Sequence, residues 1–193
     1  MKKLGLSLLI LAIALMLGGT AFAQGDNSVY FTTYYANNTA AAPDATVRFI
    51  NDGDTNGNLW AAIYVFDDSQ ELTECCACVI TPDGLLSESV KTELTANPLT
   101  GRVPTRGVIK VISSSSNDPT ATVPAAGLRG WATHIQSAAN KTPYGPAPYT
   151  QTETAFADSN LSSGEQALLQ NLCYYDALLS GSPCSCTPED HDF

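Results

Sequence analysis

Residues 46–66, TVRFINDGDTNGNLWAAIYVF, decide the fold class of this chain. Residues 46–50 and 59–66 are rich in β-branched and aromatic side chains, a composition that favours strands. The sequence NDGDTNGN between them consists of turn-forming residues and predicts a hairpin loop. Both faces of LWAAIYVF are apolar, so we expect this strand to be central and covered on both sides.

Residues 29–35, VYFTTYY, also have a good strand composition, and three weaker strand patterns lie at residues 89–94, 108–113 and 131–136. The loops between them are rich in proline, glycine and serine, which are frequent in turns. Short strands with frequent turn signals favour a sandwich over a fold of alternating strands and helices. We therefore predict a mainly β, β-sandwich-like domain, either immunoglobulin-like (Ig-like) or jelly-roll-like.

One amphipathic helix is predicted at residues 163–180. Ser163 and Gln166 have the spacing of a capping box, and Gly181 and Pro183 are expected to end the helix. Apolar residues recur at helical spacing as a stripe: Leu168, Leu172, Tyr175 and Leu179, with Leu169 and Cys173 on the adjoining rows. We expect the stripe to pack against the sandwich, because an amphipathic helix buries its apolar face.

The first 23 residues have the pattern of a secretory signal peptide. Lys2 and Lys3 precede an apolar run at residues 4–17, and Ala21-Phe22-Ala23 is a small-residue cleavage pattern. An uncleaved membrane anchor is the alternative, since the apolar run approaches the length of a span. We expect cleavage after Ala23, an N-terminal strand and linker at 24–45, and a single β-rich domain at 46–193.

The charge balance excludes two classes of partner. The chain has 9 Lys and Arg against 19 Asp and Glu; without Lys2 and Lys3 the balance is 7 against 19, a net charge of −12. Binding to nucleic acid or to anionic lipid needs clustered basic side chains. We therefore expect no nucleic-acid partner. No later apolar stretch reaches spanning length, so we expect no membrane span after signal cleavage. The signal-peptide pattern predicts a secreted protein located extracellularly, in a periplasm or at a cell surface.

The six cysteines form two groups of three. Cys75, Cys76 and Cys78 lie in ECCAC, which we expect to be a loop; the second group is Cys173, Cys184 and Cys186. An even number of cysteines in an exported protein favours disulfides. The sequence allows 15 pairings, and bonding of the first three to the last three is favoured because adjacent cysteines rarely pair.

A thiolate metal site is the alternative use of these cysteines, with His134 or His191 as a further ligand. The paired spacing typical of zinc sites is absent from the sequence, whereas Cu(I) accepts more closely spaced thiolates.

Asp52, Asp54 and Asn56 match the first positions of a calcium-binding loop. The match ends at its twelfth position, where Ile63 replaces the expected glutamate. A hairpin loop built from turn formers is the favoured interpretation, and calcium is the one cofactor that we consider.

The aromatic strand pattern at residues 29–35 allows a role in assembly. It is expected either to pair within its own sandwich or to be donated to a second copy, since strand donation builds fibres. The residues concerned are Val29, Tyr30, Phe31, Tyr34 and Tyr35. Two further tyrosines, Tyr144 and Tyr149, have the chemistry to stack on sugar rings.

Catalytic motifs are scarce in this sequence. It contains no G-x-S-x-G pattern, no phosphate-binding glycine loop and only two histidines. We therefore expect no enzyme activity, but a secreted structural, adhesive or assembly protein of the cell exterior. The alternatives are an extracellular carbohydrate- or calcium-dependent binding module, and then a thiolate metal-binding protein or a secreted enzyme.

Overall fold

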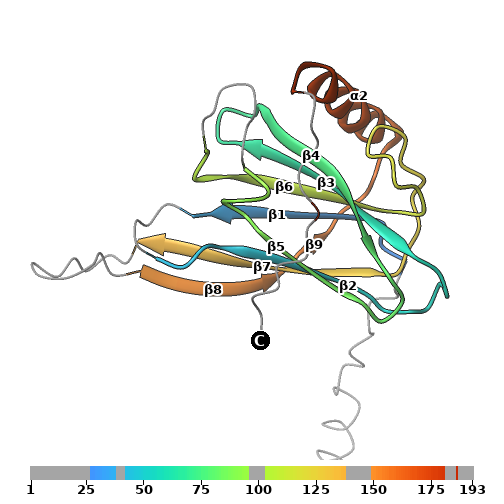
Figure 1. The fold of residues 1–193 in the computed structure, drawn as a ribbon, viewed down its shortest axis with the longest axis horizontal. Helices are drawn as coiled ribbons and strands as arrows, with labels where there is room; N and C mark the ends of the chain where they lie inside the picture. Colours follow the sequence, from blue (N-terminus) through green and yellow to red (C-terminus); the bar gives the residue numbers. More distant parts are fainter. Residues whose placement is uncertain (1–26, 38–41, 96–102, 138–148, 181–185, 187–193) are drawn as a thin grey trace, which may run out of the picture.

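The computed structural model describes residues 27–37, 42–95, 103–137, 149–180 and 186. The chain is mainly β, with two antiparallel sheets packed face to face and one C-terminal helix on the outside (Figure 1). This arrangement confirms the predicted sandwich-like fold with a C-terminal helix. Residues 1–23, the predicted signal peptide, lie outside the described residues, and cleavage after Ala23 stays a prediction.

The two sheets hold nine strands in the described part of the chain. The first sheet has the order β4 (Leu72–Ile80), β3 (Leu59–Asp67), β6 (Arg106–Ser114), β1 (Tyr30–Ala36) and β9 (Ala157–Asp158). The second has the order β5 (Leu85–Ser89), β2 (Thr46–Asn51), β7 (Leu128–Ser137) and β8 (Tyr149–Ala155). The helix is α2 (Ser163–Ser180).

Strand β3 is covered on both faces, as its sequence predicts. Ala61 and Ile63 point into the main core between the sheets. Ala62 and Tyr64 point to the outer face, into a second core that includes Leu169 of α2. All five side chains are completely buried, so burial on both faces accounts for the continuous apolar sequence of this strand.

The prediction of a hairpin between β2 and β3 is wrong. β2 pairs with β5 and β7, whereas β3 pairs with β4 and β6, so residues 52–58 cross from one sheet to the other. Side-chain hydrogen bonds hold this crossing: Asn51 Nδ2 donates to the carbonyl oxygens of Gly57 at 2.9 Å and Ile80 at 3.0 Å. Turn-forming residues allow a sharp change of direction but do not decide which sheet the next strand joins.

Two other expectations about strands need correction. The predicted strand at 89–94 lies earlier, at Leu85–Ser89, because Ser89 begins a turn in which its Oγ accepts a hydrogen bond from the Thr92 amide. The ECCAC segment is part of strand β4 and not a loop. The sequence does not predict strand β8, because all its side chains are exposed and it lacks an apolar face.

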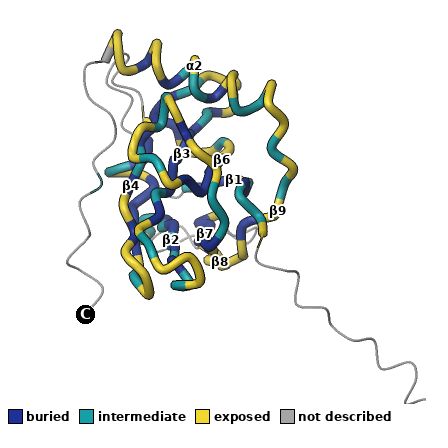
Figure 2. The backbone as a smooth tube through the Cα atoms, turned by 90° about the vertical axis from the view of Figure 1, so that its right-hand side faces the viewer, coloured by how far each residue is buried: buried dark blue, intermediate teal, exposed yellow. Residues whose placement is uncertain are grey.

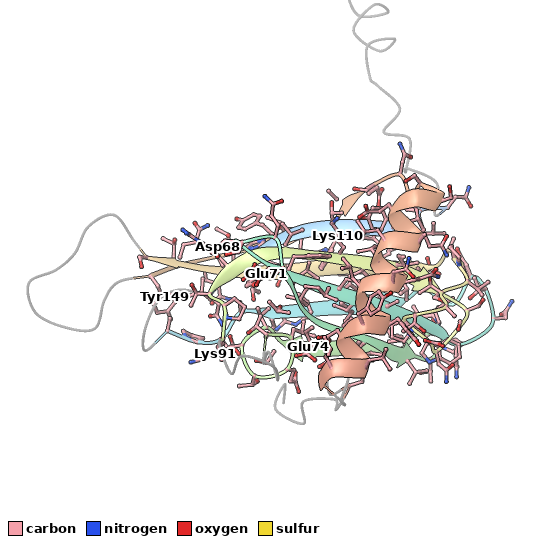
Figure 3. The ribbon with its side chains drawn as sticks, turned by 90° about the horizontal axis from the view of Figure 1, so that it is seen from above. Asp68, Glu71, Glu74, Lys91, Lys110 and Tyr149 are labelled. Atoms are coloured by element: carbon pink, nitrogen blue, oxygen red, sulfur yellow. A yellow bond between two sulfur atoms is a disulfide. The ribbon has the colours of Figure 1, made fainter. Side chains whose placement is uncertain are left out.

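Helix α2 has the predicted bounds but presents a different face to the sheet. It crosses the outer face of the first sheet (Figure 3). The cap is Ser162, whose Oγ accepts a hydrogen bond from the Glu165 amide at 3.1 Å, one residue earlier than expected. The buried side chains are Leu169, Cys173 and Asp176. Three members of the predicted stripe are exposed: Leu168, Tyr175 and Leu179.

A disulfide bond explains why a different face of α2 meets the sheet. Cys173 bonds to Cys75 of β4, and this disulfide fixes which row of the helix faces the strands. No helix among the described residues is long and apolar enough to cross a membrane.

Candidate functional site

A groove of about 650 Å³ lies at one end of the sandwich. We call it the Tyr34 groove. It lies where β1 and β3 end and β6 begins, the left end in Figure 1. Its walls include Tyr34, Asp68, Arg106 and Gln136, which come from three strands and from the turn that follows β3. The groove is therefore assembled from both sheets and depends on how they close against each other.

Tyr34 provides a flat aromatic surface in this groove. Its ring stacks on the ring of His134 in β7, with centroids 4.0 Å apart and planes inclined by 13°. His134 is completely buried, and its Nε2 lies 2.8 Å from Thr154 Oγ1 of β8. Tyr34 remains 47% exposed. Because the histidine covers one face of the tyrosine ring, the exposed area belongs to the other face and the edge.

The histidine beneath Tyr34 is uncharged at neutral pH. Burial lowers the pKa of His134, because a charged imidazolium loses its hydration in the interior. A neutral His134 is a support for the tyrosine ring, and it adds no positive charge to the groove.

Polar side chains surround the aromatic surface. Arg106 Nε donates a hydrogen bond to Asp68 Oδ2 at 2.7 Å. Asp67 holds the adjoining turn, since its Oδ1 accepts hydrogen bonds from the amides of Ser69 and Glu71. Carboxylate and guanidinium groups of this kind exchange hydrogen bonds with hydroxyl groups of a ligand.

Gly107 is required at the base of the groove. A Cβ atom there would come within 1.9 Å of the Phe66 carbonyl oxygen and 2.8 Å of the Tyr35 ring. The missing side chain lets β6 approach β3 and lets Tyr35 fill the core below the groove.

The predicted assembly strand lies within its own sheet. β1 pairs with β6 over seven consecutive residues of the same chain. Tyr30 is buried on the outer face, and Phe31 and Tyr35 belong to the main core. The Val29 carbonyl accepts a hydrogen bond from the Ser113 amide. Exchange of this strand between copies stays a prediction. Of the five residues considered for assembly, Tyr34 is the one with an exposed ring in the groove.

The sequence offers no signal that joins Tyr34 to His134. The two residues are far apart in the chain, and each belongs to an ordinary strand pattern. Of the two other tyrosines considered for sugar stacking, Tyr149 is 42% exposed and pairs with Ser137, which also lines the groove. Tyr144 lies outside the described residues, as does His191.

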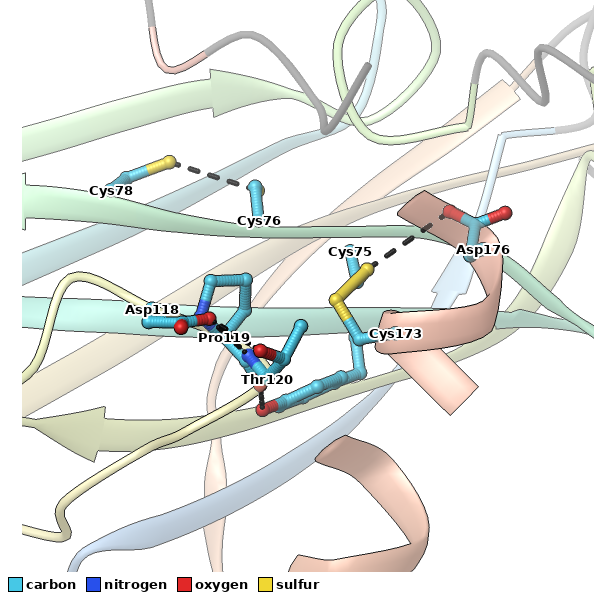
Figure 4. Close-up of a disulfide and its surroundings, with 9 residues drawn as sticks. Cys75, Cys76, Cys78, Asp118, Pro119, Thr120, Cys173 and Asp176 are labelled. Atoms are coloured by element: carbon cyan, nitrogen blue, oxygen red, sulfur yellow. Dashed lines mark hydrogen bonds between the residues drawn. A yellow bond between two sulfur atoms is a disulfide. The ribbon is translucent and has the colours of Figure 1, made fainter. Parts of the chain in front are cut away.

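The cysteines join strand β4 to the helix and tail. Figure 4 shows the bond to the helix, between Cys75 and Cys173. Cys75 bonds to Cys173, and Cys78 bonds to Cys186. Both bonds link the first group to the second, as the sequence favours. Cys76 is also disulfide-bonded, and Cys184 lies outside the described residues.

The same region contains the one close set of metal-ligand types among the described residues. The sulfurs of Cys76, Cys78 and Cys186 lie within 4.8 Å of one another. Sulfurs in disulfides are not thiolates, and thiolates are the form that binds metal. In this oxidised state the three cysteines therefore form covalent crosslinks within the fold.

Two buried carboxyl groups lie beside the first disulfide. Asp176 Oδ2 is 4.0 Å from Cys75 Sγ, and Glu74 precedes that cysteine in β4. Burial, followed by repulsion from Asp176, raises the pKa of Glu74 to about 8. Burial also raises the pKa of Asp176.

The first turn of α2 is fixed by a polar cluster. Glu165 Oε1 accepts hydrogen bonds from Tyr30 Oη at 2.8 Å and Lys110 Nζ at 2.6 Å. Burial acts to raise the pKa of Glu165, but these hydrogen bonds and the charge of Lys110 outweigh it and lower the pKa. Burial, then the hydrogen bond to Glu165, raises the pKa of Tyr30 above its usual value. We see this cluster as structural, because it attaches the helix to β1 and β6.

The DGDTNG segment has a clear structural role. Asp52 Oδ1 accepts a hydrogen bond from the Asp54 amide at 3.2 Å, and Asp52 Oδ2 lies 3.6 Å from Arg129 Nη2. Gly53 and Asn56 adopt positive φ angles of 81° and 52°, which glycine and asparagine tolerate best. Calcium binding by Asp52, Asp54 and Asn56 stays a prediction.

No protein-family model matches this chain, and no curated protein matches it. Among solved structures, the chain is similar to the crystal structure of Thermotoga maritima 1070, with 15% sequence identity. The similarity covers 72% of this chain and 99% of that chain, with a TM-score of 0.44. At that score we base no conclusion on the similarity.

Proposed function

We propose that the protein is a secreted, non-catalytic protein of the cell exterior with a structural or adhesive role, and that it adheres by binding carbohydrate in the Tyr34 groove. The observation that carries this proposal is the exposed Tyr34 ring held flat on buried His134. Disulfide bonds are consistent with an oxidising compartment outside the cytoplasm.

The chemistry of the groove suits a sugar ring. One side of a pyranose is largely C–H and packs on an aromatic face, while its hydroxyl groups need hydrogen-bond partners. Tyr34 offers the face, and Arg106, Asp68 and Gln136 offer the partners. Because the chain is strongly acidic, we expect neutral glycans to bind and sulfated or other polyanionic glycans to be repelled.

Binding to insoluble polysaccharides tests this proposal. The exported protein is mixed with cellulose, chitin or peptidoglycan, and the bound fraction is measured against protein concentration. We expect retention on at least one of these, a loss of about tenfold or more in affinity for Tyr34→Ala, and near-normal binding for Tyr34→Phe, which keeps the ring.

Tyr174→Ala is the matched control, because Tyr174 is 51% exposed but lies on α2. Its binding should equal that of the unaltered protein. Equal binding by Tyr34→Ala, or no retention on any of the three polysaccharides, would contradict the assignment of the groove.

A further inference from the structure

A smaller pocket lies at the opposite end of β7 from the Tyr34 groove. Its volume of about 190 Å³ is below the usual range for a drug-sized ligand, so it suits a single sugar unit. Its walls include the first residues of β7, part of β1 and the segment where β8 passes into β9. Figure 2 views the molecule from this end, with β1 of one sheet above β7 and β8 of the other. We call this hollow the Trp131 pocket.

Three aromatic side chains line the Trp131 pocket. Phe31 of β1 and Phe156, between β8 and β9, are buried in the main core. Trp131 is half-buried and lies on the outward face of β7, since the next residue, Ala132, belongs to the core and successive strand residues point to opposite faces. An indole beside a hollow offers a flat apolar surface and one N–H donor. This is the kind of surface on which a sugar ring packs.

The inner wall of the pocket is formed by the corner at which the chain changes sheets. The Phe156 amide donates a hydrogen bond to the Gly130 carbonyl oxygen at 2.9 Å, and the Phe156 ring lies 5.1 Å from the Phe49 ring, centroid to centroid. A Cβ atom on Gly130 would come within 2.7 Å of the Phe49 ring. Close packing at Gly130 therefore builds this wall into the core, so the pocket is formed before a ligand binds.

Polar groups line the rest of the Trp131 pocket. Asp52 Oδ2 and Arg129 Nη2 form an ion pair at 3.6 Å. That carboxylate oxygen is buried and accepts no hydrogen bond from any residue that the structure describes, although buried acceptors almost always have a donor. Asp158 is exposed and Ser28 is half-buried in the same pocket. Carboxylate, guanidinium and hydroxyl groups together can accept hydrogen bonds from sugar hydroxyls and donate to them.

The Trp131 pocket repeats the chemistry of the Tyr34 groove. Each hollow combines one aromatic ring with one aspartate–arginine ion pair. The sets are Tyr34, Asp68 and Arg106 in the groove, and Trp131, Asp52 and Arg129 in the pocket. Pairing of carboxylate with guanidinium leaves little net charge for a ligand to match, and Asp158 adds a negative charge that disfavours anions. A neutral sugar fits both hollows on these grounds.

We propose that the Trp131 pocket is a second binding site for neutral sugar units, so that one molecule holds carbohydrate at both ends of β7. The inference rests on the proposed function, because it assigns the same class of ligand to a second site. β7 has 10 residues and spans about 30 Å. Two weak sites at this separation raise the affinity for a polysaccharide surface well above that of either site, because the second contact forms within a complex that is already bound.

An NMR titration of the exported, disulfide-bonded protein, labelled with ¹⁵N, tests the pocket directly. The added sugars are cellotriose and the trimer of N-acetylglucosamine. The chain has two tryptophans, so Trp131 and Trp60 each give one indole N–H signal, and Trp60→Phe assigns them. We expect a saturable shift of the Trp131 signal with at least one sugar. The Trp60 signal should not move, because Trp60 does not line the pocket, and the Trp131 shift should persist in Tyr34→Ala.

Retention on insoluble polysaccharide tests the use of both sites at once. Trp131→Ala should weaken retention about tenfold, and its combination with Tyr34→Ala should abolish it. Arg129→Gln changes an exposed side chain of the pocket, should also weaken retention, and serves if Trp131→Ala does not fold. Trp60→Ala is the matched control, because Trp60 is half-buried in β3 of the other sheet, and it should bind normally. Melting temperatures show that each variant is folded.

Three results would overturn the proposal. They are a Trp131 signal that neither sugar shifts, retention that the pocket variants leave unchanged, and a shift produced by protonated glucosamine alone, which would assign the pocket to amines. The proposed function is tested separately by Tyr34→Ala. Retention that depends on Tyr34 and not on Trp131 would support the groove without the pocket, whereas retention that depends on Trp131 alone would support the pocket without the groove.

Discussion

Glu74 shows what burial does to a single carboxyl group in this protein. It is 3% exposed, next to a disulfide and close enough to Asp176 for their negative charges to repel. Protonation removes that repulsion and the need for hydration. The folded protein is therefore more stable when the buried Glu74 is a neutral acid than when it is an anion.

We expect Glu74→Gln to stabilise the protein at alkaline pH. The pKa of Glu74 is about 8 in the folded protein and near its ordinary value of 4.5 when unfolded. The folded state binds more protons between these values, so this group makes stability fall as pH rises from 4.5 to 8. Melting temperatures should be similar at pH 5, whereas at pH 8 the variant should be more stable by roughly 1 to 3 kcal/mol.

Glu71→Gln is the control for this experiment, since Glu71 is exposed in the turn that leads into β4. It should follow the unaltered protein at both pH values. An identical pH dependence for Glu74→Gln and the unaltered protein would show that Glu74 is ionised without penalty in the folded state.

At the scale of elements, the sequence pattern predicts the type of each segment, strand or helix. It predicts less well which neighbours that segment packs against. β3 is identified correctly because both its faces are apolar, and α2 because apolar residues recur at helical spacing over its length, although the cap is Ser162 and not Ser163. β8 is missed because an exposed edge strand such as YTQTETA needs no apolar face. The face of α2 that meets the sheet is missed because a bond between Cys75 and Cys173, remote in sequence, decides it.

The candidate site is harder to predict for the same reason. Tyr34 and His134 meet because β1 of one sheet approaches β7 of the other, a contact that neither strand's periodicity contains. The residues considered for calcium, by contrast, are adjacent in sequence, and their positions in one turn follow from that alone.

Removal of the Cys75–Cys173 bond should loosen α2 more than any single contact on its surface. The bond closes a loop with a sequence separation of 98. Because Cys78–Cys186 closes a similar loop, we expect Cys75→Ala with Cys173→Ala to lower the free energy of unfolding by about 2 to 4 kcal/mol. Urea unfolding measures this change. Leu178→Ala, at an exposed position of the helix, should have little effect on monomer stability, and an equally small effect of the cysteine pair would contradict the expectation.

At the scale of the whole molecule, the disulfide bonds and the net negative charge are the main features beyond the fold itself. Disulfides connect the edge strand β4 to the outer helix and to Cys186 of the tail, so the helix is not held on the sheet by burial alone. The chain has 19 acidic against 9 basic residues, so the whole molecule carries a net negative charge.

Signal-peptide cleavage and disulfide formation can both be tested chemically, through the N-terminal residue and the number of free thiols. We expect the exported protein to begin at Gln24, without residues 1–23, and to contain no free thiol. N-terminal sequencing and alkylation followed by mass spectrometry test both points, with the reduced, unfolded protein as the control that should take up six alkyl groups. An intact N-terminus would support the membrane-anchor alternative, and six reactive thiols before reduction would exclude the disulfide framework.

The bond between Cys78 and Cys186 also sets how the molecule responds to tension. A force that stretches the chain passes from β4 through this bond to the tail and bypasses the segment between them. That segment has a sequence separation of 108, or about 380 Å of fully extended chain. Because Cys75–Cys173 closes an overlapping loop, most of this length stays out of the loaded path until both disulfides are reduced.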